Sequence, residues 1–212
     1  MVSAANDPRK AGSIWALNLD ANLPEVPPQL TATFCQVGLE SAPALAEAMG
    51  SSSLPEIHRR FEAGRQAYAA WVGRDLAAYG WVSFDEEIVG ELNLRLRLIP
   101  GEAYIWDCAT LAAYRQQHLY SALLAHITRE LYLQPICRAW IGANLDNLAS
   151  QRGIARAGFH RVANLLVERV LGVRMVWAQG NPDIPESWVA EARRVYLGSR
   201  EKVWLDAVSR VR

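Results

Sequence analysis

Residues 103–143 limit the possible folds of this chain more than any other stretch. Residues 103–110 (AYIWDCAT) read as a strand, and residues 119–131 place an apolar residue at every fourth position, which predicts an amphipathic helix. Residues 136–143 (ICRAWIGA) read as a second strand. A helix that connects two strands of one sheet is a crossover, so these strands are expected to run parallel. The helix follows a short polar loop, and its free backbone N–H groups predict an anion-binding site.

The segments around this unit predict a mostly antiparallel sheet. Before it, strands are expected at 30–39, 65–73, 76–84 and 86–98, and helices at 42–50 and 51–64. After it, a short helix is expected over 143–159 and two strands over 160–179, with a turn near Leu171–Gly172. The predicted fold is α+β: a mixed, mostly antiparallel central sheet of about six to seven strands, with one parallel pair and helices on its sides.

Three parts of the chain are expected. Residues 1–28 read as an N-terminal extension and linker, with a tail over 1–12 and a short strand at 13–20. Residues 29–180 carry the strands and helices of the main domain. Residues 181–212 read as a helical extension beyond the core.

Composition excludes some classes of function. Basic and acidic residues are equal in number, 22 each, so no basic field is present to attract nucleic acid. No run of about 18 apolar residues predicts a membrane span, and the first residues do not resemble a signal peptide. The cysteines Cys35, Cys108 and Cys137 fit neither a metal knuckle nor a disulfide framework, which favours a reducing cytoplasm. Most of the eight tryptophans are expected in the core, and an aromatic-lined pocket is the alternative.

Two motifs resemble those of the GNAT N-acetyltransferases. The first runs from Thr110 to Arg115 and leads into the leucine-rich helix, as the acetyl-CoA loop does in that family. The second consists of Asn147, Ser150 and the pair Gly158–Phe159, which lie one strand further along the chain. Together they cover about residues 103–160, and the order of the strands extends the resemblance to roughly 30–178.

The resemblance implies the α/β/α fold of this family and acetyl-CoA as co-substrate, with an amine as the unknown acceptor. Backbone amides of Cys108 and Thr110 would hold the pantetheine arm and polarise the thioester carbonyl. No metal is implied. The residues that the resemblance assigns to acetyl-CoA are Cys108, Ala109, Thr110, Arg115, Gln116, Gln117, His118, Leu119, Tyr120, Asn147 and Ser150.

The loop departs from the family pattern at three positions. His118 and Tyr120 stand where the family has glycines, and Ala112 replaces a common proline. Glycine lets the backbone approach the phosphates closely. Either His118 donates a hydrogen bond to a phosphate while Arg115 supplies charge, or the side chains of His118 and Tyr120 block the cleft.

Asp107 is the first candidate for the general base that takes the proton of the attacking amine. A carboxylate in an apolar strand is expected to be partly desolvated; the alternative is an outward-facing residue. Glu91 is a weaker candidate. Many members of the family have the tyrosine that acts as general acid at the position of Ile154. In this chain Tyr120 or Tyr114 would have to take that role. Cys108 is not expected to be a nucleophile, because no histidine is paired with it by motif.

The resulting hypothesis is an N-acetyltransferase in which the amine attacks the acetyl thioester directly. The alternative is a GNAT-like module without catalysis that senses coenzyme A or binds a protein. A third hypothesis, compatible with both, is an oligomerisation scaffold in which Trp188 and Trp204 bury a homodimer face.

Overall fold

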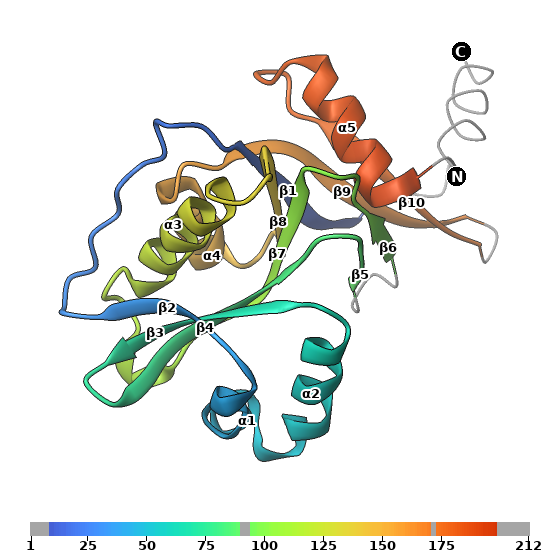
Figure 1. Cartoon of the computed structure of the whole chain (residues 1–212). Helices are drawn as coiled ribbons and strands as arrows, with labels where there is room; N and C mark the ends of the chain where they lie inside the picture. The colour runs from blue at the N-terminus through green and yellow to red at the C-terminus, as the bar shows by residue number, and fades with distance from the viewer. Residues whose placement is uncertain (1–8, 90–93, 171–172, 199–212) are drawn as a thin grey trace, which may run out of the picture.

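The computed structural model describes residues 9–89, 94–170 and 173–198. Within them, eight strands form one sheet in the order β10-β9-β1-β8-β7-β4-β3-β2 (Figure 1). The strands are β1 (Arg9–Asn18), β2 (Thr33–Val37), β3 (Gln66–Val72), β4 (Asp75–Ser83), β7 (Glu102–Thr110), β8 (Arg138–Ala143), β9 (His160–Val170) and β10 (Val173–Gly180). The helices are α1 (Ala42–Met49), α2 (Leu54–Glu62), α3 (Leu119–Tyr132), α4 (Leu148–Arg156) and α5 (Glu186–Leu197). The predicted α+β class is confirmed.

Strands β7 and β8 run parallel, as predicted, and α3 is the crossover between them. Their register extends from Glu102↔Arg138 to Ile105↔Ile141. The other strand pairs of the described sheet are antiparallel. The predicted apolar stripe of α3 is buried against the sheet, and its members are Leu119, Leu123, Ile127 and Leu131.

Beyond Ile105, β7 leaves β8 but stays paired with β4. The β4–β7 ladder continues to Ala78↔Thr110, with a register shift between Tyr79 and Trp81. Opposite this shift, Asp107 takes a positive φ of 44°, so β7 is bulged there. A Cβ on Gly80 would lie 2.7 Å from the Cys108 sulfur, which explains the glycine at this crossing. The bulge and the early end of the β7–β8 pairing open a gap in the middle of the sheet.

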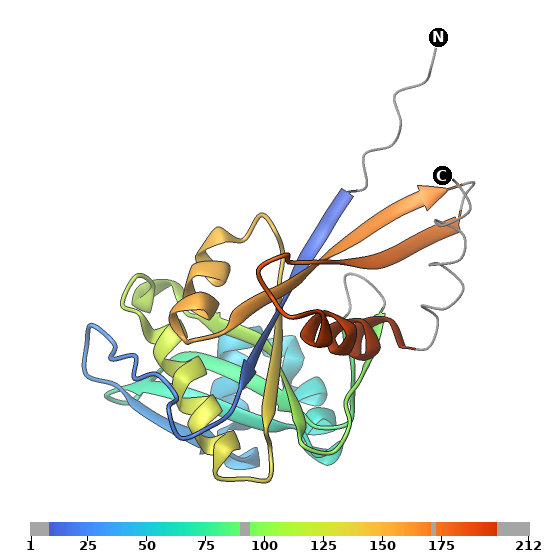
Figure 2. The same cartoon turned by 90° about the horizontal axis from the view of Figure 1, so that it is seen from above.

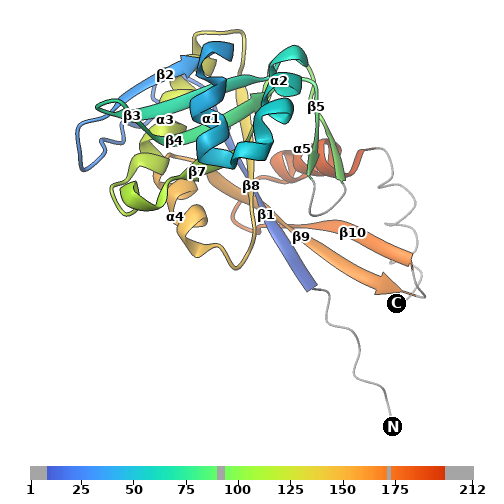
Figure 3. The ribbon, with the colours of Figure 1, turned by 90° about the horizontal axis from the view of Figure 1, so that it is seen from below.

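Strand β1 fills a place that the sequence analysis did not foresee. It lies between β8 and β9 and pairs antiparallel with both (Figure 3). Residues 9–12, expected as part of a tail, belong to this strand, and the short strand expected at 13–20 is part of it. Its run Ile14–Leu17 is buried on both faces, so it lacks the alternation that marks a half-exposed strand. The sheet therefore gains a strand beyond the six to seven expected, and residues 9–18 of the expected extension lie inside it.

The single strand expected over 86–98 is wrong. Strands β5 (Glu86–Val89) and β6 (Leu94–Arg97) pair with each other as a separate antiparallel hairpin. Residues 90–93, including the candidate base Glu91, lie outside the described residues, as does the turn expected at 171–172. Alternating leucines fit a hairpin arm as well as a longer strand, so the pattern did not reveal the break.

Helices cover both faces of the sheet. Helices α3 and α4 pack on one face, against side chains such as Trp15, Ile105 and Ile141. Helices α1 and α2 cover the β3–β4 part of the other face, and α5 covers Ile14 and Trp140 further along it. Figure 2 shows α4 and α5 on opposite sides of β1. No helix in the described ranges combines the length and apolarity needed to cross a membrane.

The expected C-terminal extension is part of this packing. Val189, Ala192, Val195 and Tyr196 of α5 are buried against the sheet. Two ion pairs, Arg194–Glu102 and Arg138–Glu191, tie α5 to β7 and β8. Trp188 packs at the edge of this cluster, whereas Trp204 lies outside the described residues. The outer limits of the domain remain a proposal.

Candidate active site

A cavity of about 260 Å³ lies where β7 and β8 separate. Tyr120, Asn147 and Ser150 line it from the α3 and α4 side, and Tyr104 and Tyr196 belong to the cluster on the α5 side. Its other lining residues are Gly12, Ser13, Val89, Trp106, Asp107, Cys108, Ile141, Gly142, Ala143, Asn144 and Leu165. The cavity thus joins the two faces of the sheet, as a site for two substrates requires.

The end of β7 offers unpaired peptide groups to this gap. From Asp107 to Thr110, β7 is paired on the β4 side only, so the peptide groups that point the other way have no partner strand. The buried hydroxyl of Thr110 also lacks a hydrogen-bond partner among the described residues. Buried polar groups without partners are rare in folded proteins. Their presence here fits a ligand that lies along this edge.

The loop before α3 keeps a backbone that glycine would favour. Gln116 and His118 have positive φ angles of 65° and 59°, in the left-handed region. His118 stands at one of the two positions where a glycine was expected, and it is the residue just before α3. The side chain of His118 does not cap the helix. The first N–H groups of α3 have no acceptor within the helix, so the loop retains the form of an anion site.

Contacts within the protein fix the other loop residues. The Tyr114 hydroxyl donates to Asp75 at 2.9 Å, away from the cavity, so Tyr114 is poorly placed as an acid. Arg115 folds back and donates from Nε to the Thr110 carbonyl at 3.2 Å. The Gln29 amide donates to the Gln117 carbonyl at 2.9 Å. Leu119 is buried in the core and offers only its backbone.

Tyr120 reaches the cavity from the first turn of α3. Its ring lies against Gly153, where a Cβ would overlap it, and its hydroxyl lies 3.0 Å from Ser150 Oγ. Burial raises the pKa of Tyr120 well above its usual range, so its hydroxyl stays protonated at neutral pH. Ile154, at the position of the family's tyrosine, is fully buried in the core. Tyr120 therefore brings a phenol to the site from α3 where α4 offers none.

Asn147 is the N-cap of α4. Its side-chain oxygen accepts the Ser150 amide at 3.0 Å. Both residues also line the cavity, so capping does not remove them from the site.

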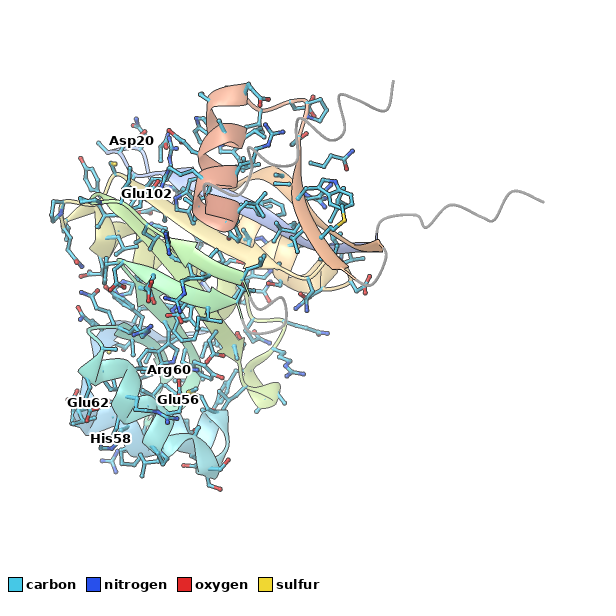
Figure 4. The ribbon with its side chains drawn as sticks, turned by 90° about the vertical axis from the view of Figure 1, so that its right-hand side faces the viewer. Asp20, Glu56, His58, Arg60, Glu62 and Glu102 are labelled. Carbon is cyan, nitrogen blue, oxygen red and sulfur yellow. The ribbon has the colours of Figure 1, made fainter. Side chains whose placement is uncertain are left out.

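Asp107 forms an ion pair that its sequence neighbours do not predict. Its Oδ2 lies 2.5 Å from Nη1 of Arg60 on α2, and its side chain is one-third exposed. The Arg60 guanidinium lies over the rings of Trp106 and Trp81, at 4.4 and 5.0 Å from their centres. Arg60 Nε also contacts Glu56 at 3.3 Å. Figure 4 shows Arg60 and Glu56 on the side of α2 nearer the sheet, and His58 and Glu62 on its outer side.

Trp106 is held by a hydrogen bond beside this ion pair. Its Nε1 donates to Ser83 Oγ at 2.8 Å, and the Ser83 hydroxyl donates to Glu87 at 2.6 Å. Glu87 is buried and paired with Arg65. The ion pair with Arg60 therefore fixes the Asp107 carboxylate, and the hydrogen bond to Ser83 fixes the Trp106 ring next to it.

Cys108 is unsuited to nucleophilic attack. Burial, and then the charge of Asp107, raise the pKa of the Cys108 thiol to about 12. Its sulfur lies 3.4 Å from the Trp106 carbonyl oxygen, as a weak donor. A thiol with this pKa is almost entirely protonated at neutral pH, and only the thiolate is a strong nucleophile.

Sequence reasoning missed several residues of the site. Arg60 lies in a helix that was predicted correctly, but nothing in its local pattern points to Asp107. Ser13 of β1 and Tyr196 of α5 line the cavity although both segments were expected outside the main domain. Trp15, Trp81 and Trp140 are buried in the core, as expected for most of the tryptophans, and Trp106 is the one tryptophan among the described residues that lines the cavity.

The comparison with protein families identifies the class. The model of the acetyltransferase (GNAT) family matches residues 45–159, which is more than half of the chain. This chain belongs to the GNAT acetyltransferase family. Proteins of this family use acetyl-CoA.

Solved structures agree on the fold. An acetyltransferase of the GNAT family from Colwellia psychrerythraea is 17% identical with a TM-score of 0.55, over 82% of this chain and 57% of that one. A tandem GNAT protein from the clavulanic acid biosynthesis pathway is 20% identical with a TM-score of 0.51, over 82% of this chain and 55% of that one. A GCN5-related N-acetyltransferase from Kribbella flavida is 18% identical with a TM-score of 0.50, over 76% and 58%. The match thus spans less than two thirds of each of these longer chains, and no curated protein matches the sequence.

Proposed function

We propose that this protein is an acetyl-CoA-dependent N-acetyltransferase that acts on a primary amine of a small molecule or a protein. The observation that carries the proposal is the cavity at the gap between β7 and β8. It brings together the unpaired edge of β7, the carboxylate of Asp107 and the phenol of Tyr120. Family membership supports acetyl transfer in general.

The residues present fit acetyl-CoA. The free peptide groups of residues 108–110 and the unpartnered Thr110 hydroxyl suit the amide-rich pantetheine arm. The first N–H groups of α3, with Arg115 nearby, suit the pyrophosphate. Asn147 and Ser150 line the same cavity as Cys108 and suit the thiol end of the coenzyme. When bound, acetyl-CoA supplies an acetyl group activated as a thioester.

Two side chains can move the protons of the transfer. As the C–N bond forms, the amine nitrogen loses one proton, and we assign its acceptance to Asp107. Arg60 contacts Oδ2 of this carboxylate, so Oδ1 is the oxygen that we assign to this step. As the C–S bond breaks, the sulfur gains one proton, and we assign its donation to Tyr120, whose hydroxyl stays protonated. The peptide N–H groups of β7 stabilise the negative charge that develops on the carbonyl oxygen.

A module that has lost catalysis is the second candidate, and the missing glycines of the loop favour it. His118 nevertheless takes a left-handed conformation at a glycine position, and Tyr120 lines the cavity with its hydroxyl directed to Ser150. These two observations favour a working loop. Calorimetry with acetyl-CoA separates the candidates, because a blocked cleft predicts no heat at high micromolar ligand.

Calorimetry is combined with a thiol-release assay over a panel of amines. Binding together with release of free coenzyme A for at least one amine supports the enzyme. Binding without release for any amine supports a module that senses coenzyme A. Absence of binding contradicts the enzyme and supports a protein-interaction module whose cleft is blocked.

We further propose a cytoplasmic setting, supported by free cysteines at Cys35, Cys108 and Cys137. A homodimer through α5 is also kept as a proposal. Of its two expected tryptophans, Trp188 already contacts His160 and Arg138 within the chain, at 6.0 and 4.9 Å.

A further inference from the structure

The hydroxyl of Tyr196 is a buried polar group at the cavity. Tyr196 lies in the last turn of α5, is 2% exposed, and lines the cavity of the candidate active site. Its hydroxyl is buried and forms no hydrogen bond of ordinary geometry among the described residues, although it lies close enough to the Tyr104 hydroxyl for each to affect the pKa of the other. Burial of a hydroxyl without a well-formed hydrogen bond is unfavourable, so its position at a cavity calls for an explanation.

The surroundings of Tyr196 form an apolar half of the cavity. The ring of Tyr104 meets it edge-on at 6.2 Å between centres. Both hydroxyls lie over Gly142, at 3.5 and 3.6 Å from where a Cβ would be, so the two phenols converge on the same point of β8. Val89, Trp106 and Leu165 complete this half. Burial raises the pKa of both phenols far above neutral, so both remain uncharged.

Asp107 is the single charged residue among the described residues that line the cavity. Arg60, which does not line the cavity, contacts Oδ2 of this carboxylate, so Oδ1 remains for a ligand. A carboxylate oxygen left in this way favours a ligand with a cationic nitrogen that donates to it, and disfavours anions. Its aromatic and aliphatic walls favour an apolar body on the molecule that carries this charge. Its volume of about 260 Å³, shared with an acetyl thioester, limits the size of that body.

The position of Tyr196 is fixed by the anchoring of α5. Arg194, two residues before it, pairs with the buried Glu102 at the start of β7, and Arg138 of β8 pairs with Glu191. Val195 and Ala192 on the same helix are fully buried. A hydroxyl held in this way is preorganised, which is what a binding or catalytic contact needs.

We propose that α5 forms the acceptor half of the active site, and that the Tyr196 hydroxyl hydrogen-bonds the nitrogen of a small monocationic amine with an apolar body. This inference rests on the proposed function, because it names the acceptor class of that same site. The cationic amine first releases one proton to solvent, which frees the lone pair of its nitrogen. The phenol oxygen accepts an N–H of this neutral amine, and Asp107 takes the proton that the nitrogen loses as the C–N bond forms. Tyr196 then touches the reacting nitrogen directly.

The experiment compares the wild-type chain with Tyr196→Phe at saturating coenzyme A. Binding of 2-phenylethylamine and of spermidine is measured by calorimetry, which does not require turnover. Tyr132→Phe, at an exposed position on α3, controls for loss of a phenol, and Val189→Ala controls for looser packing of α5. Thermal unfolding of each variant without ligand reports on the fold.

Tyr196→Phe is expected to weaken the binding of 2-phenylethylamine at least fivefold, whereas the affinity of both control variants stays within twofold of that of the wild type. The free variant is expected to unfold at the same or a higher temperature, because a buried hydroxyl without a well-formed hydrogen bond has been removed. Equal binding by the wild type and Tyr196→Phe overturns the role of the hydroxyl. Tighter binding of spermidine, or no binding of either amine by the wild type, overturns the acceptor class.

The thiol-release assay separates this inference from the proposed function. Binding that depends on Tyr196, without release of free coenzyme A, contradicts acetyl transfer but leaves the acceptor site in place. Release that is unchanged in Tyr196→Phe supports acetyl transfer and overturns this inference.

Discussion

Asp107 lies at the bulge of β7, and this position determines what its carboxylate contacts. In a regular strand, neighbouring side chains alternate between the two faces, but the bulge redirects this side chain at the gap between β7 and β8. Arg60 then holds one of its oxygens. The carboxylate is thus fixed in direction at the cavity, which is what a general base requires.

Replacement of Asp107 by Asn is expected to lower kcat by on the order of 100-fold, since an amide does not accept the amine proton. Acetyl-CoA affinity should change little, because the proposed contacts to the coenzyme come from backbone groups. Steady-state kinetics and calorimetry test this, with Asp183→Asn at an exposed turn as the matched control. A rate within threefold of the wild type would remove Asp107 from the mechanism.

Variants of His118 test whether acetyl-CoA binding by the loop depends on the imidazole side chain or on the backbone conformation. A left-handed conformation costs an L-residue roughly 1–2 kcal/mol, although histidine tolerates it better than most. His118→Gly is therefore expected to raise stability by about 0.5–1 kcal/mol after the entropy of the unfolded chain is included, and to keep acetyl-CoA affinity. His118→Val, with a β-branched side chain, should lose about 1–2 kcal/mol. Urea unfolding and calorimetry measure both; weaker acetyl-CoA binding by His118→Gly would show that the imidazole itself binds the coenzyme.

The raised pKa of Cys108 predicts its order of alkylation. At pH 8.5 the exposed Cys137 should react first with iodoacetamide, and Cys108 last, because a pKa of about 12 leaves little thiolate. Reaction of Cys108 should become detectable only as the pH approaches that pKa, or after unfolding. Mass spectrometry of peptides over time measures the order; rapid modification of Cys108 at pH 8.5 would contradict its assignment as a protonated, non-nucleophilic thiol.

At the scale of elements, one of the two ion pairs that tie α5 to the sheet contains a buried carboxylate, Glu102. Glu102 accepts from the Ile99 amide and pairs with Arg194, and it is 5% exposed. Figure 4 shows Glu102 beside α5. A buried carboxylate that keeps its charge but loses its cation is strongly unfavourable.

Arg194→Met is therefore expected to lower the free energy of unfolding by about 3 kcal/mol, and the added change Glu102→Gln should restore much of it, since no buried charge remains. Urea unfolding of the single and double variants measures the effect. Arg95→Met, in an exposed ion pair with Glu86, is the control and should cost below about 1 kcal/mol. An equal loss in the single and double variants would show that packing of the arginine stem, and not the charge, holds α5.

At the scale of the whole molecule, the sheet is completed by a strand from the start of the chain. Strand β1 pairs with β8 and β9, whose residues follow it by more than a hundred positions. Contacts over this distance form late and slowly, because a long loop must close first. Strand β1 nevertheless lies inside the sheet and lines the candidate active-site cavity through Gly12 and Ser13.

Native-state hydrogen exchange should find the amides of Ile14–Leu17 as protected as those of β8, with opening free energies close to that of global unfolding. The amide of Val26, in the connection that follows β1, should exchange far faster. Equal and fast exchange of both segments would show that β1 is not part of the stable sheet.

The sequence by itself determined the central unit and the family. Four-residue spacing on α3, the strands on either side of it and the motif around Asn147 are local patterns, and local backbone preferences are strong enough to be read from neighbours in the chain. They predicted the parallel pair and the mostly antiparallel sheet around it. The same reasoning named Asp107 and Tyr120 as residues of the site.

Only the tertiary structure decided which distant segments complete the cavity. Arg60 meets Asp107 across 47 positions, β1 enters between β8 and β9, and α5 brings Tyr196 to the cavity. These contacts form because several elements bury their apolar faces against one another. The hydrophobic effect is non-directional, so the need for burial does not tell which distant segment a given residue will contact. An apolar run such as Ile14–Leu17 predicts burial, but the packing of the whole sheet decides where in the fold that run is buried.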